Sequence, residues 1–224
     1  MKVLLAIILA AAVGYILGSC NFAIIIVKIM KGEDIREMGS KNAGLTNTYR
    51  CCGPVPALLT LIGDLCKGVV AVGLARLIAG GLHAGFSPDN DTQYIGYIAG
   101  LFAIIGHVFP CFFQFRGGKG VLVGVASFLM VSPRVFLCLL LIFIAMLAIS
   151  KYVSLSSIMA ALYCPLATLL VSWIDCGASF GRSFLYMLLS LPMAAIVIWM
   201  HRSNIERLMN ETEPKFDFRK YAGK

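Results

Sequence analysis

Two glycine-rich segments of the sequence carry side chains that suit the binding of phosphate. The first is GSKNAGLTN, residues 39–47, followed by Arg50. Its glycines let backbone amides turn toward a ligand, and its hydroxyl and amide side chains offer hydrogen bonds. The second is RGGKG, residues 116–120, where two cations stand beside three glycines directly before an apolar run. A helix starting there would also favour an anion. We expect phosphate binding, with an ordinary polar turn and a simple positively charged membrane anchor as the respective alternatives.

Three further polar groups lie in or beside apolar runs. Asp64 and Lys67 stand three residues apart in GDLCKG and share a helical face; inside a membrane such a pair is either structural or in contact with substrate. The run SLSS, residues 154–157, begins another apolar stretch as a helix cap or a polar lining. His201 and Asn204 follow the last apolar run and share a face if the helix continues, the alternative being a frayed tail.

The composition places these segments in a membrane protein. Of the 224 residues, 59% are apolar and 13% are charged, whereas about 25% is usual for soluble domains. We expect an all-α integral membrane protein, one domain over residues 1–224, whose first apolar run is retained as a span. About seven spans are predicted, the fourth and fifth of them short, with a turn at 132–133, at about 3–27, 54–79, 94–113, 120–132, 135–149, 154–172 and 183–200.

The distribution of basic residues predicts an orientation. Fourteen of the 19 lysines and arginines fall in alternate loops and after the last span, the side that also carries both glycine-rich segments. Because cytoplasmic loops retain positive charge, we expect the N-terminus outside and the C-terminus in the cytoplasm.

Other compositional features narrow the function. The net charge of +8 comes without a nucleic-acid-binding motif, so no nucleic acid is expected and an anionic membrane surface or a phosphorylated substrate fits better. The eight cysteines show no CxxC pairing and are expected to be buried free thiols. The sequence has neither a Walker spacing nor a metal-ligand cluster, so we expect no ATP, no metal and no cofactor.

Five segments occur in a fixed order across nearly the whole chain: GSKNAGLTN with Arg50, GDLCKG, GHVFPCFFQFRGGKG, SLSS and HRSNIERL. Together they resemble the bacterial acyl-phosphate-dependent glycerol-3-phosphate acyltransferases, the PlsY family. The resemblance implies transfer of a fatty acyl group from acyl phosphate to the 1-hydroxyl of sn-glycerol 3-phosphate, giving lysophosphatidic acid and phosphate in phospholipid synthesis. It also implies a multi-pass inner-membrane enzyme whose active site opens to the cytoplasm, with functional coupling to the enzyme that makes acyl phosphate.

The resemblance and the chemistry of the side chains together suggest the site. Ser40, Arg50 and His201 are the expected catalytic residues: Ser40 stabilises charge on the attacked carbonyl, Arg50 holds phosphate, and His201 fixes the acceptor. Either His201 or a phosphate oxygen of the substrate takes the hydroxyl proton. The expected substrate-binding residues are Gly39, Asn42, Gly44, Thr46, Asn47, Lys67, His107, Gly117, Gly118, Lys119, Gly120, Ser154, Ser156 and Asn204.

Some positions depart from the family's usual motifs. Leu122 and Val123 stand where the second motif commonly continues with alanine and threonine. Any role of that threonine is therefore not transferred to this chain. After HRSNIERL, Glu211 replaces a glycine, while Thr212 and Glu213 remain.

Two other functions stay open from the sequence. One is a small membrane transporter of an anionic substrate, for which the ionisable pair would mark the pathway. The other is an acyltransferase that uses acyl-CoA or acyl carrier protein. An HxxxxD arrangement is absent, since Phe112 stands five positions after His107 and Glu206 five after His201.

Overall fold

A computed structural model describes residues 1–85 and 91–216 of the chain. Within these ranges the regular structure is entirely helical, which confirms the predicted all-α fold class. Three of the basic residues behind the predicted orientation, Arg219, Lys220 and Lys224, lie outside the described residues. The orientation of the termini stays a prediction.

The helices follow one another along the chain in the order of their numbers. The first half of the chain contains α1 (Lys2–Ser19), α2 (Phe22–Lys31), the 3₁₀ turn η1 (Ile35–Glu37), α3 (Leu45–Cys52), α4 (Pro54–Gly81) and α5 (Gln93–Val108). The second half contains the 3₁₀ turn η2 (Cys111–Phe113), α6 (Val121–Val131), α7 (Pro133–Ser150), α8 (Val153–Leu170), the π-helical turn η3 (Val171–Asp175), α9 (Phe180–Met200) and α10 (Arg202–Met209).

Six helical segments of the described chain are long and apolar enough to cross a membrane. The seventh predicted span is α6, which has only 11 residues and reaches about 16 Å, roughly half of a hydrocarbon core. The expected turn is present, because Ser132 is extended and Pro133 begins α7. The expectation of a short fifth span is wrong: α7 has 18 residues. A count of seven spans stays a prediction.

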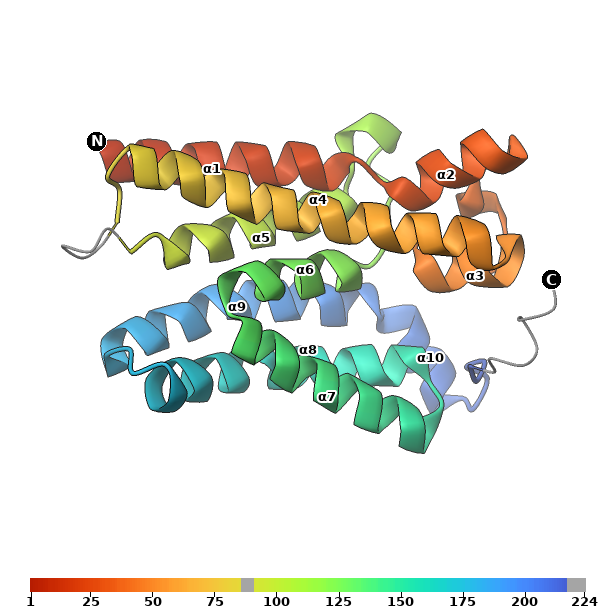
Figure 1. Cartoon of the computed structure of the whole chain (residues 1–224). Helices are drawn as coiled ribbons and strands as arrows, with labels where there is room; N and C mark the ends of the chain where they lie inside the picture. The colour runs from red at the N-terminus through yellow and green to blue at the C-terminus, as the bar shows by residue number, and fades with distance from the viewer. Residues whose placement is uncertain (86–90, 217–224) are drawn as a thin grey trace.

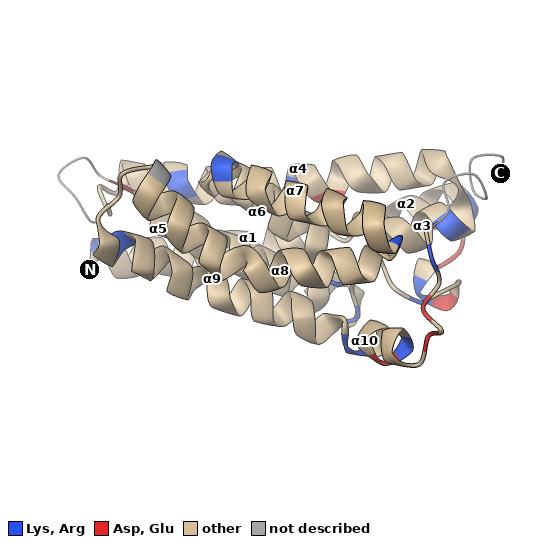
Figure 2. Cartoon of the chain, turned by 90° about the horizontal axis from the view of Figure 1, so that it is seen from below, with Lys and Arg blue, Asp and Glu red and all other residues tan. Residues whose placement is uncertain are grey.

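The helices form two layers with α6 between them (Figure 1). One layer contains α1, α4 and α5, and the other contains α7, α8 and α9. Small residues bring α1 and α5 into close contact, since a Cβ added at Gly14 or Gly18 would collide with a carbonyl oxygen of α5. Such small-residue contacts are typical of helix packing in membranes. Lysine and arginine gather toward the two ends of the molecule, and the middle is largely uncharged (Figure 2).

The first predicted span, 3–27, is interrupted. Ser19 ends α1, and Asn21 caps α2 by accepting a hydrogen bond from the amide of Ile24 at 3.2 Å. The buried Asn21 also donates to the carbonyl oxygen of Ala43 at 3.4 Å. The break therefore anchors the first glycine-rich loop to the helices.

All eight cysteines are free, as expected, but only Cys164 is buried. The prediction that the cysteines are buried is wrong for the other seven, of which Cys66, Cys111 and Cys176 are exposed. A thiol is a small and largely apolar group, so it is compatible with a helix face that lipid covers.

Candidate active site

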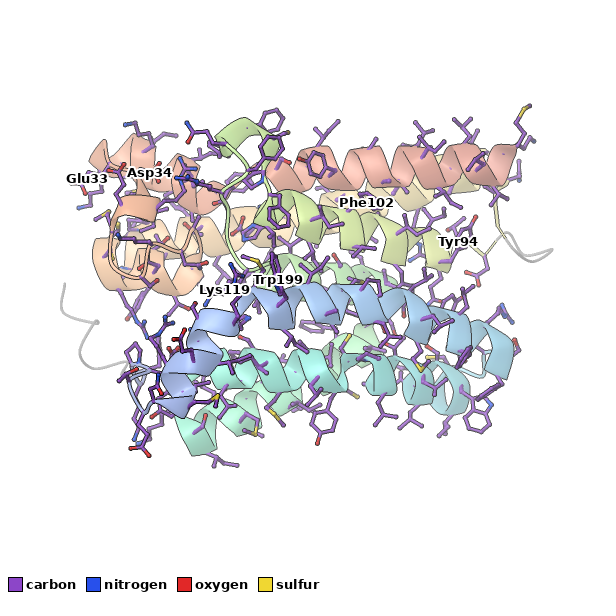
Figure 3. The ribbon with its side chains drawn as sticks, turned by 180° about the vertical axis from the view of Figure 1, so that it is seen from behind. Glu33, Asp34, Tyr94, Phe102, Lys119 and Trp199 are labelled. Atoms are coloured by element: carbon purple, nitrogen blue, oxygen red, sulfur yellow. The ribbon has the colours of Figure 1, made fainter. Side chains whose placement is uncertain are left out.

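A cavity of about 820 Å³ lies where the two glycine-rich loops meet the start of α8 and the junction of α9 and α10. Figure 3 shows Lys119 between the layer that contains α1, α4 and α5 and the layer that contains α9. Fourteen of the 17 predicted site residues line this cavity: Gly39, Ser40, Asn42, Gly44, Thr46, Asn47, Arg50, His107, Gly117, Lys119, Gly120, Ser154, His201 and Asn204.

Asn47 organises the first glycine-rich loop. Its Oδ1 accepts a hydrogen bond from the amide of Ser40 at 2.9 Å. Its Nδ2 donates to the carbonyl oxygens of Ile35, Met38 and Asn42 at 3.0–3.2 Å. With these four contacts the buried side chain is largely occupied by the protein itself, and it holds Ser40 at the cavity.

Arg50 keeps donors available to a ligand. Its Nη2 donates to the carbonyl oxygen of Pro214 at 3.4 Å, while its Nε is buried without a hydrogen-bond partner in the described part of the chain. Because a buried unpaired donor is costly, the arrangement favours an anion in the cavity.

The second glycine-rich loop is held against the end of α5. The amide of Gly117 donates to Val108 at 3.0 Å, and that of Gly118 donates to His107 at 3.1 Å. Gly120 has a φ of 82° and is the N-cap of α6, the helix that the sequence predicts for this apolar run. A φ in this range favours glycine. The N-terminus of α6 therefore faces the cavity, and its free amides and dipole favour a phosphate.

Arg36, in η1 just before the first glycine-rich loop, joins this segment to the second loop, a role that the sequence did not indicate. Its side chain binds both carboxylate oxygens of Asp34 at 2.7–3.0 Å, and its Nη1 donates to the carbonyl oxygens of Phe113 and Arg116 at 2.8 and 3.3 Å. The ion pair lowers the pKa of Asp34 and raises that of Arg36. Arg116, the other cation of the RGGKG turn, is exposed and outside the cavity.

Lys119 belongs to a network of hydrogen bonds between side chains that line the cavity. Its ammonium group donates to Oδ1 of Asn204, and Nδ2 of Asn204 donates to Glu213 at 2.7 Å. Burial, opposed by the attraction of Glu213 and helped by the charges of Arg207 and Arg50, lowers the pKa of Lys119 to about 8. At pH 7 the side chain stays mostly charged, with two further N–H donors for a ligand.

Glu213 is the centre of this network and was not among the predicted site residues. It accepts hydrogen bonds from Ser154 at 2.6 Å and from Asn204 and Arg207 at 2.7 Å. Burial raises its pKa, but these hydrogen bonds outweigh burial and the pKa lies below its ordinary value. The only sequence signal was that this glutamate is retained after HRSNIERL. Of the two alternatives for the SLSS segment, Ser154 is part of a polar lining and not a helix cap, because α8 already begins at Val153 and Ser154 contacts Glu213.

His201 stands between α9 and α10 as a neutral imidazole. Its Nδ1 lies 2.7 Å from the carbonyl oxygen of Val197, so Nδ1 carries the proton. Burial, and then the charge of Lys119, lower the pKa of His201 to about 4. Its Nε2 is therefore a hydrogen-bond acceptor at neutral pH. His201 and Asn204 meet at the cavity through a change from one helix to another, not through a continued α9.

Three predicted site residues do not line the cavity: Lys67, Gly118 and Ser156. Lys67 forms an ion pair with Asp64 at 2.8 Å and lies beneath the cavity, and Gly118 packs against His107. Ser156 is buried and donates to Tyr152 at 2.8 Å, while its neighbour Ser157 lines the cavity. The helical turn decides this difference, because adjacent serines project in different directions.

A second cavity, of about 300 Å³ and almost entirely apolar, adjoins the first. It is lined mainly by α6, α7, α8 and α9, with a few residues of α4 and α5. It shares Val121, Leu122, Phe143 and Ser157 with the polar cavity. The first cavity, hereafter called the chamber, is therefore continuous with the second, called the groove. Among the described residues, no group of three or more His, Cys, Asp or Glu side chains is arranged to hold a metal ion.

The chain resembles known proteins over nearly its full length. Residues 8–211 match the family model described as glycerol-3-phosphate acyltransferase. The chain is 38% identical to a glycerol-3-phosphate acyltransferase of Geobacillus kaustophilus (strain HTA426), with 94% of each chain covered. It is also 38% identical to one of Carboxydothermus hydrogenoformans (strain ATCC BAA-161 / DSM 6008 / Z-2901), with 96% of this chain and 98% of the other covered.

Solved structures show the same fold. The crystal structure of PlsY (YgiH), an integral membrane glycerol 3-phosphate acyltransferase, in its glycerol 3-phosphate form has a TM-score of 0.77 and 31% identity, and both chains are covered completely. Its lysophosphatidic acid form has a TM-score of 0.74 and 29% identity, again over both full chains. The chain therefore belongs to the glycerol-3-phosphate acyltransferase family, the family that its motifs resemble.

Proposed function

We propose that this protein transfers a fatty acyl group from acyl phosphate to the 1-hydroxyl of sn-glycerol 3-phosphate, releasing lysophosphatidic acid and inorganic phosphate. The observation that carries the proposal is the junction of the two cavities, where a basic chamber opens into an apolar groove. A soluble phosphate ester and a lipid-like acyl chain can meet only at such a boundary, since each needs a different surrounding.

The basic chamber supplies the binding site of the acceptor. The phosphate of glycerol 3-phosphate would contact the free donors of Arg50 and Lys119 and the N-terminus of α6, because charge-assisted hydrogen bonds and helix amides suit phosphate oxygens. His201 would accept a hydrogen bond from a hydroxyl group through Nε2. These contacts hold a small anion beside the mouth of the groove.

The reaction needs little more than this positioning. The acceptor hydroxyl oxygen attacks the carbonyl carbon of the acyl phosphate, an ester bond forms, and the bond from that carbon to the phosphate oxygen breaks. With a pKa of about 4, His201 is a weak base, so the departing phosphate is the better acceptor of the hydroxyl proton. Ser40 would stabilise the charge that develops on the carbonyl oxygen.

The charges of the chamber support acyl phosphate as the donor. Lys41, Arg202 and Arg207 line the cavity in addition to Arg50 and Lys119, and Asp64 and Glu213 are the carboxylates of its lining. Five cations less two carboxylates leave a net charge of +3, which is more than one dianionic phosphate balances. Two phosphate groups, one from each substrate, would balance it. An acyl phosphate is already activated, which agrees with a site that offers no strong base.

The remaining expectations follow from this assignment. We propose a single domain in the bacterial inner membrane, with the cavity facing the cytoplasm and the N-terminus outside, and functional coupling to the enzyme that makes acyl phosphate. Family membership favours an acyltransferase over the transporter alternative. The ion pair of Asp64 and Lys67 is internal, with each side chain almost completely buried.

The test is transfer by the purified protein from three donors, acyl phosphate, acyl-CoA and acylated acyl carrier protein, to labelled glycerol 3-phosphate. We expect labelled lysophosphatidic acid with acyl phosphate alone. Lys119→Met should remove most of this activity, whereas Arg116→Gln, which changes the exposed cation of the same turn, should keep it. Transfer from acyl-CoA but not from acyl phosphate by folded protein would refute the donor, and equal loss in both variants would refute the site.

A further inference from the structure

Three ionisable side chains form a buried cluster below the phosphate-binding chamber. Asp64 and Lys67 come from α4 and His107 from α5, and each is at most 5% exposed. Only Asp64 and His107 reach the cavity lining. Because the desolvation of two charges can cost more than their pairing gains, a buried ion pair is weak evidence for stability, and the cluster calls for a function beyond packing.

The contacts of Lys67 decide where His107 carries its proton. Its Nζ lies 2.9 Å from the carbonyl oxygen of Cys20, 2.8 Å from Oδ1 of Asp64 and 2.9 Å from Nδ1 of His107. The carboxylate of Asp64 balances the charge of the ammonium group. An ammonium group has three donors and no lone pair, so Nδ1 of His107 must accept. The proton of the neutral ring is then on Nε2.

Nε2 of His107 faces the loop that we assign to phosphate. A Cβ added at Gly118 would collide with this atom. In the described part of the chain no protein group accepts a hydrogen bond from Nε2. The ring is also fixed to the loop through the backbone, because the amide of Gly118 donates to the carbonyl oxygen of His107. A fixed, unused N–H donor thus lies beside the glycine turn.

We propose that Lys67 is a positioning residue that holds His107 in the Nε2–H form, so that His107 donates a hydrogen bond to a phosphate oxygen in the chamber. The identity of that phosphate as a substrate group rests on the proposed function. Without Lys67, Nδ1 would face the carboxylate of Asp64, which lies 3.8 Å away. The proton would then move to Nδ1 and leave a lone pair on Nε2, which repels phosphate.

The test is ¹⁵N NMR of histidine-labelled protein in lipid nanodiscs at pH 8, with inorganic phosphate as the probe. Variants of the three histidines assign their signals. In the wild type we expect a proton on Nε2 of His107 and not on Nδ1, and a shift of the Nε2 signal when phosphate is added. Lys67→Met should move the proton to Nδ1 and weaken phosphate binding at least about tenfold, the effect of one hydrogen bond to a charged group.

Lys67→Arg is the matched control, because a guanidinium group stays charged when buried, has no lone pair, and should therefore keep the Nε2–H form. In Asp64→Asn/Lys67→Met the carboxylate that attracts the proton is also gone, so phosphate binding should recover in part. A proton on Nδ1 in the wild type, or an Nε2–H form and phosphate response unchanged by Lys67→Met, would overturn the proposal. The wild-type and control spectra decide even if Lys67→Met does not fold. These measurements need no turnover, so a failure of the proposed acyl donor would be seen separately.

Discussion

Gly118 lies where the second glycine-rich loop approaches both His107 and the first loop, and Gly118→Ala tests whether this approach matters for acyl transfer. An added Cβ would meet Nε2 of His107 and the carbonyl oxygen of Ala43 more closely than real Cβ atoms approach other atoms. The φ of Gly118 is not in the left-handed region, so the cost is steric. A backbone oxygen cannot rotate away, and the loop itself must move.

The size of the movement sets the expected effect. Ordinary contact for a Cβ begins at 3.4 Å, so relieving the collision requires a shift of roughly 1 Å. A displacement of this size at a site that works by positioning costs about 100-fold in rate. We therefore expect kcat/KM for glycerol 3-phosphate to fall by about 100-fold, or roughly 2.7 kcal/mol of transition-state stabilisation.

The assay compares Gly118→Ala with Gly73→Ala, using transfer from acyl phosphate by purified protein. Gly73 lies within α4 and lines neither cavity, and its added Cβ would have Met130 Cε as its nearest neighbour at 3.5 Å. This control should keep wild-type activity and gain up to about 1 kcal/mol of helix stability. If folded Gly118→Ala keeps kcat/KM within about threefold of the wild type, the positioning argument is refuted.

Three side chains of the chamber and one of the groove allow further tests. As the pH rises through about 8, Lys119 loses its proton and kcat/KM should fall; this limb should be absent in Lys119→Met, and its survival there would contradict the assignment. His201 stays neutral above about 4, so His201→Ala should lower kcat/KM without changing the shape of its pH profile between about 5.5 and 7.5; loss of a limb in that range would show that His201 titrates. Because the pKa of Glu213 is lowered, its contribution to stability is present above the ordinary value of 4.5 and is lost as the pH falls through the folded pKa. Glu213→Gln should lower the thermal midpoint at pH 7 by about 4 °C and weaken this dependence, and calorimetry that finds no change would count against the network. Ala161→Phe should narrow the apolar groove and shift the preference toward shorter acyl phosphates, whereas an unchanged chain-length profile would place the acyl chain elsewhere.

Much of the architecture could be predicted because most of the helices are long, continuous runs of apolar residues in the sequence. Long apolar runs must be helical in lipid, where every backbone amide needs an internal partner, and the structure has apolar helices at these places. The glycine-rich loops could also be identified from the sequence, because the types of their residues determine what they can bind. The sequence did not reveal the break at Cys20 and Asn21, because the whole run around it is apolar enough to predict one continuous span.

The sequence by itself thus determined the membrane class, the helical content and the residues of the two loops. Only the tertiary structure decided that Glu213 joins Ser154, Asn204 and Arg207, and that Lys67 lies outside the cavity lining, where it contacts the lining residue His107. The physical reason is that composition acts locally, whereas these contacts join side chains up to 59 positions apart. Their geometry follows from the way whole helices pack, which no local pattern records.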